Sequence, residues 1–159
     1  MADFYVKLGD ATSFTKTVSE SDVYQFAGIT GDFSPNHVNK PYMEKSSYGR
    51  LMAHGALLVG FMSTVSTQAI AHCRDADETP VSVGYDKLRF LKAVFIGDTV
   101  TVNYTISDID TDRKRSTGTI EVTNQDDELV AVGQHILQWC QTGNLAAATI
   151  SARPEGAGA

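Results

Sequence analysis

A largely apolar stretch at residues 51–65 constrains this chain more than any other feature. It contains no Asp, Glu, Lys or Arg, and its interruptions are His54, Gly55, Gly60, Ser63 and Thr64. A bilayer-spanning helix needs about 20 apolar residues, so the stretch is too short to cross a membrane. A helix that is apolar on nearly every face is normally buried. We therefore predict a central core helix over residues 51–70, which other elements must surround.

The surrounding elements are expected mainly downstream, where apolar and polar residues alternate. This period of two is typical of half-buried strands. The expected strands are residues 14–18, 81–90, 100–107, 117–122 and 129–139. The polar run at 124–128 predicts a hairpin turn. A change of parity near Asp86 and Lys87 predicts a β-bulge.

Shorter helices fit the upstream sequence. Ser19 or Ser21 is a plausible N-cap for a helix whose apolar face includes Val23 and Phe26. Residues 40–48 have room for another turn or two. One long buried helix with a run of antiparallel strands predicts an α+β domain, its sheet wrapped around the helix. We expect one domain over residues 1–145 and a flexible tail over 146–159.

Composition excludes several classes of protein. The 159 residues carry a formal net charge of −6, and the sequence pI is about 5.0. Nucleic-acid and anionic membrane partners are disfavoured, because both require a basic surface. Cys73 and Cys140 lack the spacing of a disulfide framework or of a metal site. The first residues have no apolar signal region, so we expect a cytoplasmic protein.

The densest group of reactive side chains lies in the run Gly-Asp-Phe-Ser-Pro-Asn-His at residues 31–37. In a loop after a helix, Asp32 and His37 could face one point and exchange protons with one water molecule. An ordinary turn, in which Asp32 bonds its own backbone, is the competing interpretation. A hydrolase triad with Ser63 lacks a nucleophile elbow. A zinc site from Asp32, His37 and His54 lacks a recognisable ligand spacing.

Three blocks, residues 26–37, 49–55 and 90–99, together resemble the MaoC-like hydratases, the (R)-specific enoyl-CoA hydratases. The resemblance extends over roughly residues 14–140 and implies the hot-dog fold of that family. Departures from the family pattern occur at Ser34, Asn36, Asn39, Ala93 and Ile96. Asp32 and His37 are retained, but the polar Asn36 between them leaves the identity of the substrate's acyl group undetermined. A plain fatty, methyl-substituted or carboxylated chain is compatible with the sequence.

The resemblance implies that Asp32 and His37 hold a water against C3 of a trans-2-enoyl thioester. One would remove a proton from that water while the other, with Asp32 favoured, protonates C2. Gly55 would receive the thioester oxygen at the helix N-terminus, and Ser63, Asn36 and His54 would support the site. Candidate cations for the CoA phosphates are Arg50, Lys87, Arg89 and Lys92.

The resemblance implies neither a cofactor nor a metal, and it implies a homodimer or a larger homo-oligomer. The acyl group could be carried by CoA or by an acyl-carrier protein, and the physiological direction is open. Two other functions remain compatible with the sequence. One is a hot-dog acyl-CoA thioesterase, although residues 51–70 lack the acidic residue usual on its central helix. The other is a non-catalytic module that binds acyl thioesters.

Overall fold

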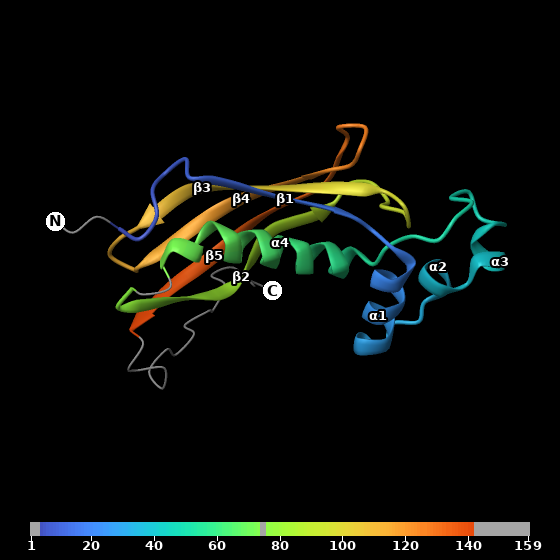
Figure 1. Cartoon of the computed structure of the whole chain (residues 1–159), viewed down its shortest axis with the longest axis horizontal. Coiled ribbons are helices and arrows are strands. Elements are labelled where there is room, and N and C mark those ends of the chain that lie inside the picture. The colour runs from blue at the N-terminus through green and yellow to red at the C-terminus, as the bar shows by residue number, and fades with distance from the viewer. Residues whose placement is uncertain (1–3, 74–75, 142–159) are drawn as a thin grey trace, which may run out of the picture.

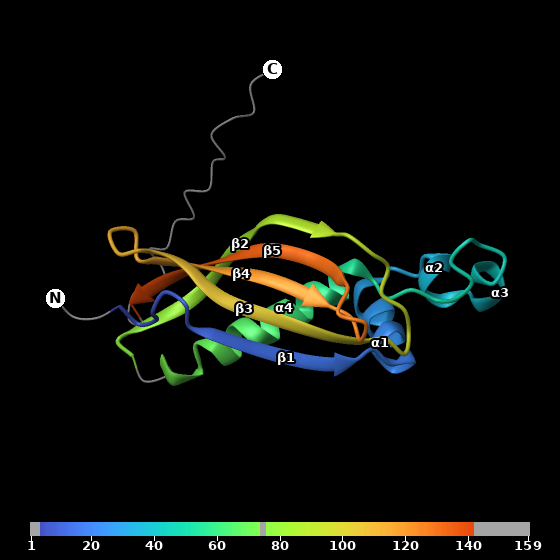
Figure 2. The same cartoon turned by 90° about the horizontal axis from the view of Figure 1, so that it is seen from above.

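Five strands form one antiparallel sheet in the computed structural model, which describes residues 4–73 and 76–141. The strands are β1 (Ala11–Thr17), β2 (Glu78–Phe90), β3 (Thr99–Asp110), β4 (Arg115–Thr123) and β5 (Leu129–Gln141). Their order across the sheet is β1-β3-β4-β5-β2, so β1 and β2 are the edge strands (Figure 2). Every neighbouring pair is antiparallel.

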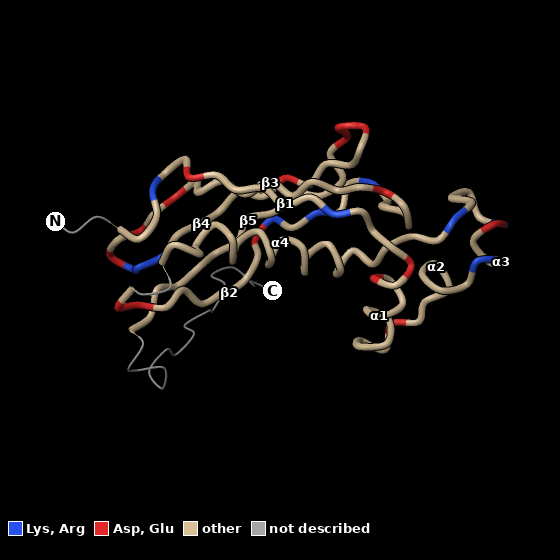
Figure 3. Tube along the Cα trace, in the orientation of Figure 1, with Lys and Arg blue, Asp and Glu red and all other residues tan. Residues whose placement is uncertain are grey.

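The long helix α4 (Gly55–Ala69) lies against one face of this sheet (Figure 1). The helix carries no charged residue, so its trace is tan throughout in Figure 3. Leu58, Phe61, Met62 and Val65 are buried between the helix and the sheet. Each such side chain stabilises the fold by about 1.5–3 kcal/mol through burial. The predicted α+β architecture, a sheet around a buried helix, is confirmed.

The alternating sequence produces the expected strand faces. In β3, Val100, Val102, Tyr104 and Ile106 are buried, whereas the residues between them are half-buried or exposed. The predicted hairpin turn is present between β4 and β5, where the N–H of Asn124 and the carbonyl of Glu128 are 3.0 Å apart. The two-residue period of β3 thus determined which of its side chains face α4.

Strand β2 contains the predicted irregularity. Its register with β5 shifts between Asp86 and Arg89, and Lys87 has a φ of 52°. A second shift, between Ser82 and Gly84, was not expected from the sequence. Both shifts bend an edge strand, where bulges are most common.

The central helix is shorter than predicted, because it begins at Gly55 rather than at residue 51. Met52 pairs with Phe95 in an isolated antiparallel bridge. The N–H of Ala53 also donates to the carbonyl of Val94 at 2.8 Å. These pairings hold the approach to the helix in an extended conformation.

Three short helices lie beyond one end of the sheet (Figure 1): α1 (Glu20–Thr30), α2 (Pro35–Val38) and α3 (Lys40–Met43). Ser19 is the N-cap of α1, and its side chain forms a capping box with Asp22. Helix α3 falls within the predicted helical region, whereas α2 replaces part of an expected loop. None of the helices in the described ranges is long and apolar enough to traverse a bilayer. The tail expected over residues 146–159 lies outside the described residues.

Candidate active site

The cluster begins where α1 ends. Gly31 closes the helix with a φ of 80°, and its N–H donates to the carbonyl of Ala27 at 2.8 Å. Glycine suits this left-handed position, which ends many helices. The N–H of Ser34 then donates to Oδ1 of Asp32 at 3.2 Å. The turn therefore uses one oxygen of the exposed Asp32 carboxylate, as the competing turn interpretation requires, and leaves the other oxygen for a further contact.

His37 lies on α2, which starts with Pro35 at its first position. Its Nδ1 is 2.8 Å from the backbone carbonyl oxygen of Met52. A carbonyl oxygen only accepts hydrogen bonds, so we assign the ring proton to Nδ1. Nε2 is then unprotonated, and the Asn36 amide nitrogen donates to it at 3.2 Å. His37 therefore presents a basic nitrogen while its other nitrogen fixes the ring.

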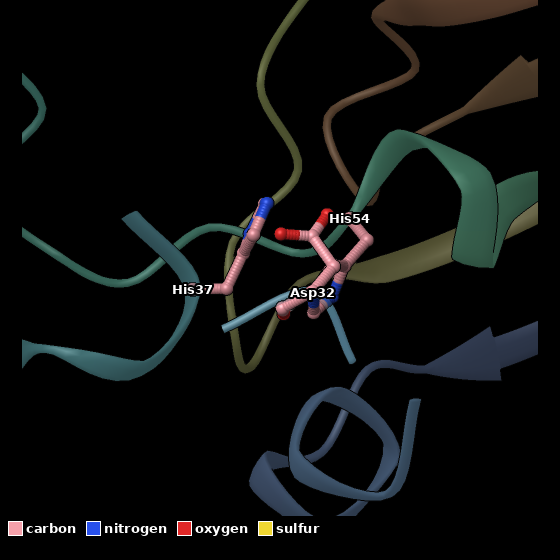
Figure 4. Close-up of side chains that lie close together, drawn as sticks. All are labelled: Asp32, His37 and His54. Atoms are coloured by element: carbon pink, nitrogen blue, oxygen red, sulfur yellow. Dashed lines mark hydrogen bonds between the residues drawn. The ribbon is translucent and has the colours of Figure 1, made fainter. Parts of the chain in front are cut away.

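His54, the N-cap residue of α4, packs face to face with His37. Their ring centres are 3.7 Å apart and the ring planes differ by 23°. Nε2 of His54 lies 3.0 Å from the backbone oxygen of Asp32, to which it donates. His54 therefore contacts both residues of the predicted acid–base pair, as the close-up in Figure 4 illustrates.

Asp32, His37 and His54 each offer one polar side-chain atom within 4.8 Å of the other two. Two groups that hydrogen-bond to one water at tetrahedral angles are about 4.6 Å apart. The spacing therefore suits a single water shared by these side chains. A carboxyl group and an unprotonated imidazole beside one water can remove one proton and supply another.

The same side chains fit a zinc ion less well. Two imidazoles on one tetrahedral Zn²⁺ hold their ring centres about 5 Å apart. The stacked rings of His37 and His54 are closer, at 3.7 Å. One nitrogen of each ring also donates to a carbonyl oxygen. Coordination by both rings would require the stack to open.

A cleft of about 400 Å³ adjoins the cluster at the N-terminus of α4. His37 and Asn36 line one side, and Gly55 and Leu58 line another. The remaining lining residues are Tyr48, Met52, Ala53, Phe90, Leu91, Lys92, Ala93 and Val94. The first backbone N–H groups of a helix lack partners within it and attract negative charge. The cleft thus brings a basic imidazole close to a helix N-terminus.

The four predicted cations differ in their positions. Arg50 and Lys92 line a second cleft, of about 450 Å³, which shares Tyr48, Leu91, Lys92 and Ala93 with the first. The Arg50 guanidinium lies 4.0 Å from the centre of the Phe95 ring and 3.7 Å from Asp98.

Lys92 forms an ion pair with Glu128. Lys87 and Arg89 belong to the bulged part of β2, outside the residues that line either cleft. Two of the four cations therefore lie near the cluster.

Ser63 lies apart from the cluster. It is exposed, two turns into α4, and its side chain neighbours that of Tyr85 on β2. Two further contributors to the site were not predicted from the sequence: the Met52 carbonyl that orients His37 and the Phe90 ring that covers Gly55. A backbone acceptor leaves no signal in a sequence, and Phe90 was apparent only as part of a resembling block.

Comparison with known proteins agrees with the family resemblance found in the sequence. The profile of the MaoC-like domain family matches residues 7–128. An (R)-specific enoyl-CoA hydratase of Rhodospirillum rubrum is 37% identical over 109 residues, which cover 69% of this chain and 72% of the relative. A 3-hydroxybutyryl-CoA dehydratase of Methylorubrum extorquens is 30% identical over 111 residues, covering 70% and 67%.

A solved structure gives the corresponding result for the fold. The (R)-hydratase of Aeromonas caviae superposes with a TM-score of 0.75 at 23% identity, covering 84% of this chain and 96% of that one. At this identity the likeness concerns the fold alone. The sheet around a central helix is the hot-dog fold, as the resemblance implied.

Proposed function

Because the chain belongs to the MaoC-like domain family, we propose that it adds water reversibly across the 2,3-double bond of an enoyl thioester. The product of hydration is the (R)-3-hydroxyacyl thioester, and the reverse reaction is a dehydration. The observation that carries this proposal is the convergence of the side chains of Asp32 and His37 beside a cleft that His37 lines.

In the proposed reaction, a water replaces the Asn36 amide at Nε2 of His37 and gives a proton to that nitrogen, and the resulting hydroxide attacks C3. Asp32, starting as the carboxylic acid, gives its proton to C2. One water is thereby added as H and OH, and a proton passes from His37 back to Asp32 through solvent. The tautomer assigned to His37 supports its role as the base.

Negative charge gathers on the thioester oxygen as C3 is attacked. Backbone N–H groups at the start of α4, near Gly55, are suited to stabilise that charge. They are already oriented by the helix, so the free energy of reorganisation is small. Leu58 and Phe90, which line the same cleft, provide apolar contacts for the start of an acyl chain.

The thiol end of the substrate is CoA or a carrier-protein arm. Arg50 and Lys92 are the best-placed candidates for contacts with CoA phosphates, because both line the neighbouring cleft. Phosphates would have to compete with Asp98 and Glu128 for these cations. Lys87 and Arg89 remain secondary candidates on β2, and Ser63 remains a candidate support.

We also propose that the working molecule is a homodimer or a larger homo-oligomer. Strand β2 is a sheet edge, and an unpaired edge is prone to association. Exposed apolar side chains occur on and after the short helices and at the end of β2: Tyr24, Ile29, Phe33, Tyr42, Tyr48, Phe90 and Leu91. Light scattering coupled to size exclusion would measure the mass in solution, and a monomer would contradict this part of the proposal.

The test of function is a panel of enoyl-CoA substrates that includes crotonyl-CoA and mesaconyl-CoA. Hydration removes the enoyl absorbance and raises the product mass by one water, without releasing thiol. Chiral analysis of the product should give the (R) isomer. Thiol release would instead indicate a thioesterase, and binding without turnover would indicate a binding module. The absence of charge on α4 counts against the thioesterase.

A further inference from the structure

His54 has one hydrogen-bonding atom that is not satisfied. The side chain is only 2% exposed, and its Nε2–H donates to the backbone oxygen of Asp32. Its Nδ1 is buried and has no hydrogen-bond partner among the described residues. A buried acceptor without a donor is energetically unfavourable. This cost falls on the residue that contacts both members of the proposed acid–base pair.

The ring of His54 is tightly placed. One neighbour is His37, with its ring centre 3.7 Å away, and another is Phe26 of α1, at 4.8 Å. His37 itself is fixed by the Met52 carbonyl. The Nδ1 lone pair lies in the plane of the His54 ring, so the face of the ring, rather than this lone pair, meets His37.

We propose that His54 is a positioning residue that acts on both members of the pair. Its Nε2–H holds the backbone of Asp32, and the face of its ring, stacked on His37, supports His37 as that ring becomes positively charged. The inference rests on the hydratase function proposed above.

The physical reason is that the positive charge on His37 develops only during the reaction. His37 is neutral before reaction and gains a proton from the water only as the transition state forms. The π face of an aromatic ring attracts an imidazolium stacked on it more strongly than it attracts another neutral ring. An interaction of this kind, made mainly in the transition state, raises kcat rather than lowering KM.

Two substitutions at His54 separate its hydrogen bond to Asp32 from its ring contact with His37. His54→Gln retains an amide N–H that can reach the Asp32 carbonyl but removes the ring. His54→Phe retains a flat ring against His37 but removes the donor and the lone pair. His135→Gln is the matched control, because His135 is a buried histidine, 1% exposed, that contacts Ser82, Tyr85 and Tyr104 instead.

With crotonyl-CoA as substrate, we expect each His54 variant to lose kcat by about tenfold or more, with KM changed less than about threefold. The His135→Gln control should keep the parent kcat even if its melting temperature falls. Circular dichroism would establish that each variant is folded. A parent-like kcat in either folded His54 variant would overturn the proposal, as would a loss expressed only in KM.

A second measurement needs no substitution. Nitrogen-15 NMR of the parent protein's histidines distinguishes the two ring tautomers. We expect the proton of His54 on Nε2 and the proton of His37 on Nδ1. A proton on Nδ1 of His54 at neutral pH would overturn the proposal about His54 alone. Lack of turnover by the parent protein would refute the hydratase function instead, so the two failures are distinguishable.

Discussion

The ring of Phe90 packs directly on Gly55, so that a Cβ added to Gly55 would lie 2.8 Å from Cε2 of the ring. Phe90 is the last residue of β2 and Gly55 is the first of α4. Both residues line the cleft beside His37. The missing side chain of Gly55 therefore sets how closely the strand approaches the helix N-terminus.

Gly55→Ala should impair catalysis more than stability. Phe90 is 50% exposed, so its ring can move away from the added methyl group without disrupting the core. That movement changes the cleft, and we expect kcat/KM to fall roughly tenfold to a hundredfold. The melting temperature should change little. Steady-state kinetics of the double variant Gly55→Ala, Phe90→Ala tests the cause, because removing the ring should recover part of the loss.

Asp32→Asn and His37→Ala should each abolish most hydratase activity without unfolding the protein. Loss of a proton-transfer group typically reduces the rate by about 10²- to 10⁴-fold. Asp108→Asn, at an exposed position on β3, is the control for loss of one carboxylate. Loss of enoyl absorbance from crotonyl-CoA measures the rate. Parent-rate hydration by Asp32→Asn would contradict the assignment of Asp32.

Stability should decline in mild acid because of His135. Burial lowers the pKa of His135 from 6.5 to about 4. Between these values the unfolded chain binds more protons than the folded chain, so the free energy of unfolding falls as pH falls. A shift of this size corresponds to about 3 kcal/mol, present in full above the unfolded value.

Urea unfolding at a series of pH values measures this dependence. The His135→Gln variant should show a shallower decline across the same interval, because it has no imidazole to protonate. An equally steep decline in that variant would attribute the acid sensitivity to other groups.

Gly118→Ala should destabilise the sheet strongly. An added Cβ would overlap the end of the Tyr104 ring, which is fully buried. Overpacking of this kind costs about 1–3 kcal/mol. In a Tyr104→Leu background the same change should cost less, and denaturant unfolding of the double-mutant cycle measures the coupling. Equal costs in both backgrounds would show that the Tyr104 ring is not the obstacle.

Local patterns determined much of this protein. The alternation in β3 predicted which side chains face the helix, and the uncharged stretch predicted the buried α4. Ser19 was one of two expected caps, and it is the cap observed. These features depend on neighbours within a few residues, because helix and strand periods are properties of the local backbone.

Contacts between distant segments were decided only by the tertiary structure. Because Met52 pairs with Phe95 in an isolated bridge, α4 begins at Gly55 rather than at residue 51. The Met52 carbonyl then fixed the tautomer of His37, and His54 stacked against the same ring. No period or spacing encodes such pairings, because they depend on how the extended approach to α4 packs against α2 and the segment after β2. The sequence alone thus identified an acid and an imidazole, and the packing determined which nitrogen is basic and what holds it in place.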